Sequence, residues 1–244
     1  MMSDYQPAPS QRKGTLVPAG LKDAVYVLPL PILQLMVPRL PIGTDPFTPH
    51  VRERRVIFIH VPKAAGSSIK MSLYGTKDGG HRRILEFAAY DAQKTRDFFK
   101  CAFVRNPWDR LLSAYSYMMQ GVGTTWRDNQ FAKAHLAQHA DFNGFVIALA
   151  DPRYRAVVMR YDHFRPQCHW LCISRRKGHA MDFLGRFETM QADLARLSEI
   201  LGIELSRGHK ERPSVHAPFR EAYTSETWRI VSEIYAGDIR SFGY

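Results

Sequence analysis

The chain has 244 residues, of which 45% are apolar and 23% charged, and this ordinary globular usage excludes a disordered or collagen-like protein. The formal charge is +11, and the excess is concentrated in residues 51–190, which carry 23 basic against 12 acidic side chains. Such a field attracts an anionic ligand, and a nucleotide, a nucleic acid and a polysaccharide all remain open. Three cysteines are too few for a disulfide scaffold and no signal peptide opens the sequence, so we expect a cytoplasmic protein.

Residues 1–50 are unusually rich in proline. The most apolar stretch, 24–37, is too short to cross a bilayer and is interrupted by Pro29 and Pro31, so it predicts no membrane anchor. The proline runs favour extended, polyproline-like backbone over helix. We therefore predict an N-terminal arm over residues 1–50, which wraps the domain or meets a partner, and one domain over residues 51–244.

The first chemically informative segment is a strand, a small-residue loop and a helix. Residues 55–61 are β-branched and aromatic, as in a strand buried on both faces of a parallel sheet. Lys63 and Gly66 follow Pro62, and a helix is expected to start near Ser67. The free N–H groups of a first helical turn, together with a lysine, suit an oxyanion. The alternative is an ordinary turn with a solvated lysine, and the residue order differs from that of a Walker A loop.

A second segment repeats this layout. Residues 98–104 read as another buried strand, after which Asn106 is a good N-cap and Pro107 a good first helical residue. Arg105 then lies at the carboxyl end of the strand, where open α/β sheets bind ligands, and Ser113 lies two turns into the helix. The alternative is that Arg105 only caps the helix or pairs with Asp109.

Together these two segments resemble a known family. Residues 58–69 resemble the 5′-phosphosulfate loop, and residues 103–115 the 3′-phosphate motif, of carbohydrate sulfotransferases. The resemblance is to the group related to the heparan-sulfate 2-O- and chondroitin/HNK-1-type enzymes, and it implies a soluble, bacterial-type member. Similarity continues through residues 183–188 and 238–244, so that it covers roughly residues 55–244.

The resemblance implies a P-loop-like α/β fold with a central, mainly parallel sheet flanked by helices. It implies 3′-phosphoadenosine 5′-phosphosulfate (PAPS) as donor, no metal, and as acceptor a hydroxyl group of a carbohydrate or another molecule, including an anionic one. Arg105 and Ser113 would bind the 3′-phosphate. The sulfate and the 5′-phosphate would be bound by the loop residues Lys63, Ala64, Ala65, Gly66, Ser67 and Ser68.

Two histidine segments complete the predicted site. His81 resembles the catalytic base that follows the phosphosulfate loop in the 2-O-sulfotransferase branch, and an imidazole suits proton transfer at neutral pH. The alternative is a histidine in a basic loop. A later segment resembles the one that helps bind the acceptor, although its polar residues would equally suit the rim of a core; it holds His163, Arg165, Gln167 and His169.

Other basic and metal-like patterns carry less weight. His135 and His139 lack the glutamate of a zinc-protease motif, and Cys168 and Cys172 lack ligands of suitable spacing, so no metal is predicted. Residues 175–178 are a secondary candidate for nucleotide contact. A magnesium-dependent kinase and a basic nucleic-acid-binding module are the competing functions, but no aromatic-and-basic stripe supports the second, and we expect no nucleic-acid partner.

The rest of the sequence predicts scaffold elements, while the strand order and oligomeric state stay open. The expected strands lie near 55–61, 98–104, 171–174 and 182–187, and the expected helices cover 107–120, 129–150, 189–201 and 224–236.

Overall fold

A three-stranded parallel sheet forms the centre of the computed structural model, which describes residues 30–36, 45–76, 80–121, 123–173, 178–206 and 218–244. Its strands are β1 (Val56–Ile59), β2 (Phe99–Val104) and β3 (Phe183–Arg186), in the order β1-β2-β3. Both strand pairs are parallel. The predicted α/β architecture is confirmed, as are the three strands near 55–61, 98–104 and 182–187.

The strand predicted near 171–174 is wrong for the residues that the structure describes. Leu171 ends a short helix, α11 (Cys168–Leu171), and no strand follows before residue 174, where the described segment stops. The carboxylate of Asp238 accepts the backbone N–H groups of Gln167 (2.6 Å) and Cys168 (2.9 Å). These bonds satisfy first-turn donors and favour a helix where the apolar run alone indicated a strand.

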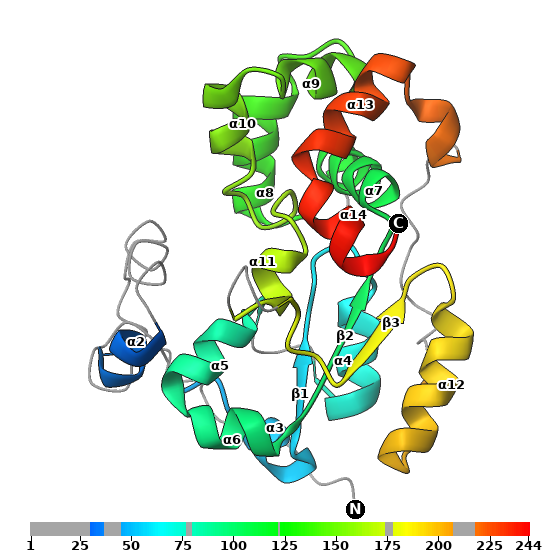
Figure 1. Ribbon diagram of the computed structural model, residues 1–244. Helices are drawn as coiled ribbons and strands as arrows, with labels where there is room; N and C mark the ends of the chain where they lie inside the picture. Colours follow the sequence, from blue (N-terminus) through cyan, green and yellow to red (C-terminus); the bar gives the residue numbers. More distant parts are fainter. Residues whose placement is uncertain (1–29, 37–44, 77–79, 122, 174–177, 207–217) are drawn as a thin grey trace, which may run out of the picture.

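Helices cover both faces of the sheet (Figure 1). On one face, Phe58 and Phe103 pack with α4 (Gly66–Tyr74) and α12 (Met190–Leu201). On the other, Ile57 and Ile59 pack with α5 (Ile84–Tyr90) and with α11. Gly185 pairs with Phe103, and a Cβ there would lie 2.4 Å from the Phe103 ring, so this strand position excludes a side chain.

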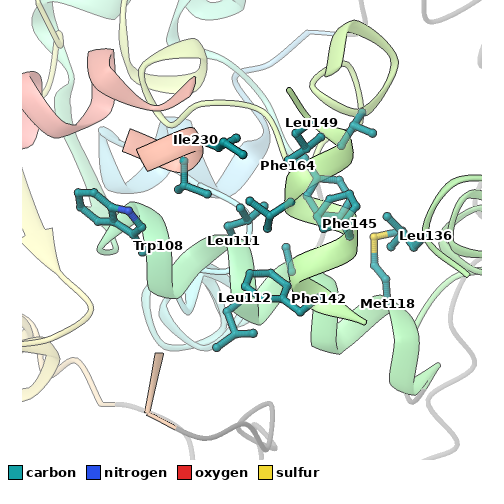
Figure 2. Close-up of a cluster of buried hydrophobic side chains, with 14 of the residues drawn as sticks. Trp108, Leu111, Leu112, Met118, Leu136, Phe142, Phe145, Leu149, Phe164 and Ile230 are labelled. Atoms are coloured by element: carbon teal, nitrogen blue, oxygen red, sulfur yellow. The ribbon is translucent and has the colours of Figure 1, made fainter. Parts of the chain in front are cut away.

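A second, all-helical layer gathers beyond the carboxyl ends of the strands (Figure 1). Its core contains Leu111, Phe142, Phe145 and Ile230, which are buried together (Figure 2). The core brings α7 against α9 and α13, so the helix after β2 is anchored along its length. The elements of this layer are α7 (Pro107–Gln120), α8 (Trp126–Phe131), the π-helix η1 (Ala132–Leu136), α9 (Phe142–Ala148), α10 (Pro152–Val158), α13 (Ser225–Ile234) and α14 (Ala236–Phe242).

Helix boundaries follow local capping. Asn106 caps α7 by accepting from the N–H groups of Trp108 and Asp109, as the sequence predicts. The helix predicted over 129–150 is instead interrupted after η1, because the Asp141 side chain accepts from the Gly144 N–H and starts α9 anew. The helix predicted over 224–236 ends at Ile234, and α14 follows directly.

Part of the predicted arm is helical. Helix α2 (Leu30–Met36) carries Pro31 in its first turn, where proline is tolerated, so the extended backbone expected there is wrong. Leu33 is fully buried against Leu85 and Ala89 of α5. Among the described residues, no helix is both long and apolar enough to span a bilayer. The remaining elements are α3 (Pro49–Arg54), α6 (Ala92–Asp97) and the 3₁₀ helix η2 (Phe219–Ala222).

Candidate active site

The loop between β1 and α4 has a strained backbone. Lys63 (φ 68°) and Ala65 (φ 59°) occupy the left-handed region, which residues other than glycine adopt rarely. Two guanidinium groups hold the loop: Nη1 of Arg105 donates to the Lys63 carbonyl (3.2 Å), and Nη1 of Arg110 donates to the Pro62 carbonyl (3.4 Å). Such strain persists where surrounding contacts fix it, and it is common at ligand sites.

The first turn of α4 has the features of an anion site. Ser68 is buried, and its Oγ has no hydrogen-bond partner among the described residues. A buried hydroxyl without a partner needs an explanation, and a ligand oxygen at this turn would provide one. The ammonium group of Lys63 lies 3.8 Å from the centroid of the Tyr117 ring, beside the same loop. The residues present therefore fit a phosphate or sulfate group.

Arg105 is more restrained than the sequence suggested. It is 6% exposed, its Nε donates to Oδ2 of Asp109 (2.7 Å), and its guanidinium lies 4.0 Å from the Phe187 ring centroid. The alternative pairing with Asp109 is therefore present, but among the described residues Nη2 makes no hydrogen bond. Ser113, on α7, is 1% exposed. Arg105 could thus offer one terminal nitrogen to a ligand while the rest of the group stabilises the protein.

Gln167 helps to hold Arg105 in place, and its side chain does not face a cavity. It is fully buried, its Oε1 accepts the Arg105 N–H (2.9 Å), and its Nε2 donates to the Arg105 carbonyl (2.8 Å). Its amide is thereby used inside the protein. The expected contact of Gln167 with the acceptor consequently has no geometric support. We interpret Gln167 as a residue that orients Arg105.

Three histidine rings lie beside the loop. Nδ1 of His81 is 3.1 Å from the carbonyl oxygen of His60, and the two ring centroids are 4.3 Å apart. Because a carbonyl only accepts, Nδ1 of His81 carries the proton and Nε2 presents a lone pair. Burial lowers the pKa of His81 below its ordinary value of 6.5, so the ring is neutral at pH 7. His81 therefore has the tautomer that a general base requires.

His163 is the third ring, 6.2 Å from His81 and 5.3 Å from Tyr117 between ring centroids. Its Nε2 lies 3.3 Å from Oδ1 of Asp128, which also accepts from the hydroxyl of Tyr161 (2.6 Å). Burial alone would raise the pKa of Asp128, but hydrogen bonds from His163, Tyr161 and Thr125 hold it well below its ordinary range. The carboxylate is therefore ionised and orients His163.

Arg165 and His169, the other predicted acceptor contacts, pair with each other. Nη1 of Arg165 is 2.8 Å from Nε2 of His169, and Nε of Arg165 donates to the Arg160 carbonyl (2.7 Å). The secondary candidate over residues 175–178 lies outside the described residues except for Gly178. No group of three His, Cys, Asp or Glu side chains in the described segments is arranged to hold a metal ion.

Sequence reasoning missed two residues that organise the site. Arg110, 1% exposed, donates to the carbonyls of Pro62, His163 and Arg165, so it ties the loop to the histidine segment. Asp128 orients His163, and its pairing with Thr125 at the start of α8 is a capping box. The T-x-x-D pattern could have marked a helix start, but nothing in the sequence placed it beside His163.

The comparison with known families agrees with this geometry. The model of the sulfotransferase family matches residues 51–244, so it covers both strand-to-helix segments and all three rings. The chain belongs to the sulfotransferase family. Neither the search of curated proteins nor the search of solved structures gave a match.

Proposed function

We propose that the protein transfers the sulfuryl group of PAPS to an acceptor hydroxyl group, and that the acceptor is a carbohydrate. The observation that carries the proposal is that Lys63, on a strained loop before α4, is linked to the neutral His81, whose Nε2 is open, through the rings of Tyr117 and His163. Tyr117 contacts both the Lys63 ammonium and the His163 ring, and His163 faces His81. A donor-binding cation and a base thus share one cluster, as transfer between two bound substrates requires.

On this proposal the donor lies across the ends of β1 and β2. Lys63 and the backbone amides of Ala64, Ala65, Gly66, Ser67 and Ser68 bind the sulfate and the 5′-phosphate. Nη2 of Arg105 and the hydroxyl of Ser113 bind the 3′-phosphate. Support comes from the orphaned Oγ of Ser68 and from the one terminal nitrogen of Arg105 without a bond to a described residue.

The proposed chemistry is a single displacement. Nε2 of His81 takes the proton of the acceptor hydroxyl while the acceptor oxygen forms a bond to sulfur. The bond between sulfur and the bridging oxygen of the 5′-phosphate breaks, which releases adenosine 3′,5′-bisphosphate. Lys63 stabilises the negative charge that develops on that bridging oxygen, and this effect is largest in the transition state.

A basic cavity beside the histidines supports an anionic acceptor. The cavity has a volume of about 220 Å³, and its lining includes His50, His60, Lys70 and Arg82 and, among the described residues, no carboxylate. Its wall at Gly80 directly precedes His81, and Nζ of Lys70 donates to the Gly80 carbonyl (2.9 Å). A uronate or sulfate group in this cavity would lie next to the base. On the other side of His81, the acceptor would contact His163, Arg165 and His169.

The predicted organisation is part of the proposal. Residues 51–244 form the catalytic domain, residues 1–50 form an arm that contacts it through α2, and the protein acts in the cytoplasm without a metal or a nucleic-acid partner. The family match begins at residue 51, which agrees with this boundary.

A transfer assay with radiolabelled PAPS tests the reaction. A panel of uronic-acid-containing and neutral polysaccharides is incubated with the protein, with magnesium or with a chelator. We expect label in a uronic-acid polymer and no effect of the chelator. Transfer from ATP that requires magnesium, with none from PAPS, would overturn the proposal in favour of a kinase.

A further inference from the structure

His60 lies where the donor loop, α4 and the base meet. It follows β1 directly, and its ring occupies the space beside Gly66, the first residue of α4. A Cβ at position 66 would lie 1.9 Å from Cδ2, 2.5 Å from Cγ and 2.6 Å from Nε2 of His60. Real atoms do not approach so closely, so His60 in this position requires glycine at 66.

The same residue orients His81. The His60 carbonyl accepts the hydrogen bond from Nδ1 of His81, and the two rings are in contact at 4.3 Å between centroids, tilted by 53°. The carbonyl fixes the tautomer of His81 and the ring fixes the plane in which its Nε2 lies. One residue thereby touches both the helix that would bind the donor and the group that would activate the acceptor.

The His60 ring is uncharged in this position. Burial is the main cause that lowers its pKa well below 6.5, and the electrostatic effect of nearby histidine and lysine side chains lowers it further. The titratable groups that face it are His81, Lys70, His163 and Lys63. A neutral ring can pack against Gly66 and His81, whereas a charged ring there would be desolvated and would be repelled by the ammonium groups of Lys70 and Lys63.

We propose that His60 is a positioning residue that couples the donor loop to the general base, with Gly66 as its matching surface. The inference rests on the proposed function and adds to it a required spatial relation between the two substrate sites. His60 itself does not contact the reacting atoms. Its effect on the rate acts through His81, and its contact with the first turn of α4 is steric, so the ring limits nucleotide binding only when position 66 carries a side chain.

A double-mutant cycle tests this coupling, using the dissociation constant of adenosine 3′,5′-bisphosphate and kcat for PAPS-dependent transfer. Gly66→Ala forces the His60 ring and the first turn of α4 apart, so it should weaken nucleotide binding by about tenfold or more. His60→Ala should leave nucleotide binding within about threefold and lower kcat by about ten- to a hundredfold, because the base loses its orientation.

The decisive variant combines both changes. With the ring removed, the added Cβ has room, so His60→Ala/Gly66→Ala should bind the nucleotide within about threefold of wild type, while kcat stays as low as in His60→Ala. Gly237→Ala is the matched control, because a Cβ at Gly237 on α14 would meet nothing within 4 Å. It should change neither quantity.

Two results would overturn the inference. If the double variant binds the nucleotide no better than Gly66→Ala, the ring is not what the glycine accommodates. If His60→Ala keeps the wild-type kcat, His60 does not position the base. Should His60→Ala fail to fold, His60→Asn takes its place in the cycle, with the same two criteria.

Failure of the proposed function gives a different pattern. Wild-type protein would then bind no adenosine 3′,5′-bisphosphate, and the thermal unfolding of the four variants would still report the contact. Rescue of Gly66→Ala stability by His60→Ala would support the steric part of the coupling without any donor. Absence of that rescue would contradict the coupling itself.

Discussion

The two predicted anion sites differ in how many of their hydrogen-bonding groups are already paired within the protein. Around Lys63 the backbone is strained, Ser68 has a buried hydroxyl without a partner among the described residues, and His81 presents an open Nε2. Around Arg105 most hydrogen-bonding groups are paired: Nε of Arg105 donates to Asp109, and the Gln167 amide bonds both the backbone N–H and the carbonyl of Arg105. We interpret the first region as the one arranged for ligand binding and for chemistry. The second is a rigid frame, so changes there should affect stability and binding together.

The largest effect is expected at the base. His81→Ala should lower kcat by ~10²–10⁴, the usual range for losing a positioned acid or base, while nucleotide binding stays nearly intact. Calorimetry and turnover measure the two quantities. Since the pKa of His81 is lowered by burial, wild-type activity should persist at pH 6.5 and fall only at more acidic pH. Activity within a few-fold of wild type in the variant would transfer the role to His163 or His169.

A somewhat smaller effect is expected at the donor cation. Lys63→Ala should reduce kcat by ~10²–10³, as for removal of one preorganised donor, and weaken adenosine 3′,5′-bisphosphate binding much less. Lys100, which pairs with Asp182 at the start of β2, supplies the control, because Lys100→Ala removes a cation far from the loop. A raised KM with unchanged kcat in Lys63→Ala would mean that Lys63 binds the ground state and the transition state equally and does not accelerate the transfer.

On the rigid side, Arg105→Ala should act twice. Charge-assisted hydrogen bonds are worth ~1.5–3 kcal/mol each, so the preference for a 3′-phosphate should fall by tens of times. Loss of the guanidinium also removes its ion pair with the partly buried Asp109, so the free energy of unfolding should fall, by up to ~3 kcal/mol. Asp109→Asn should destabilise the protein and keep the nucleotide preference. If Arg105→Ala and Asp109→Asn lost the preference for a 3′-phosphate equally, the change in preference would reflect only the loss of stability.

The smallest effect concerns acid stability. The folded-state pKa of His60 lies below its unfolded value, so the unfolded chain binds more protons once the pH falls below about 6.5. Stability is full above that pH and is lost as the pH falls towards the folded-state pKa, by about 1.4 kcal/mol for each unit between the two values. His60→Gln should flatten this part of the curve in chemical denaturation between pH 7 and 5. If the free energy of unfolding depended on pH in the same way in wild type and in His60→Gln, the lowered pKa of His60 would be contradicted.

Local sequence patterns predicted the elements that carry the site. The buried runs before Lys63 and Arg105 became β1 and β2, and Asn106 with Pro107 marked the start of α7, because these signals act within a few residues. The strand near 171 was wrong because its outcome depends on Asp238, about seventy residues away, whose carboxylate caps α11. No local pattern carries that information.

The same distinction applies within the candidate site. Motifs in the sequence indicate His81 and Lys63, and the structure brings their segments together through Tyr117 and His163. The roles of Arg110 and Asp128 depend on which carbonyls and rings the fold brings to them, so sequence reasoning could not find them. The segment of Gln167 resembles one that helps bind the acceptor, whereas in the structure the Gln167 amide pairs with the backbone N–H and carbonyl of Arg105.

The most direct test of the central claim is a pair of dissociation constants for the wild-type protein, measured by calorimetry at two salt concentrations. If the chain is a PAPS-dependent sulfotransferase, adenosine 3′,5′-bisphosphate should bind at least tens of times tighter than AMP, because Arg105 and Ser113 recognise the additional phosphate. The ratio should persist at the higher salt concentration, since these two groups are buried. Equal affinity for the two nucleotides would contradict the assignment of PAPS as the donor.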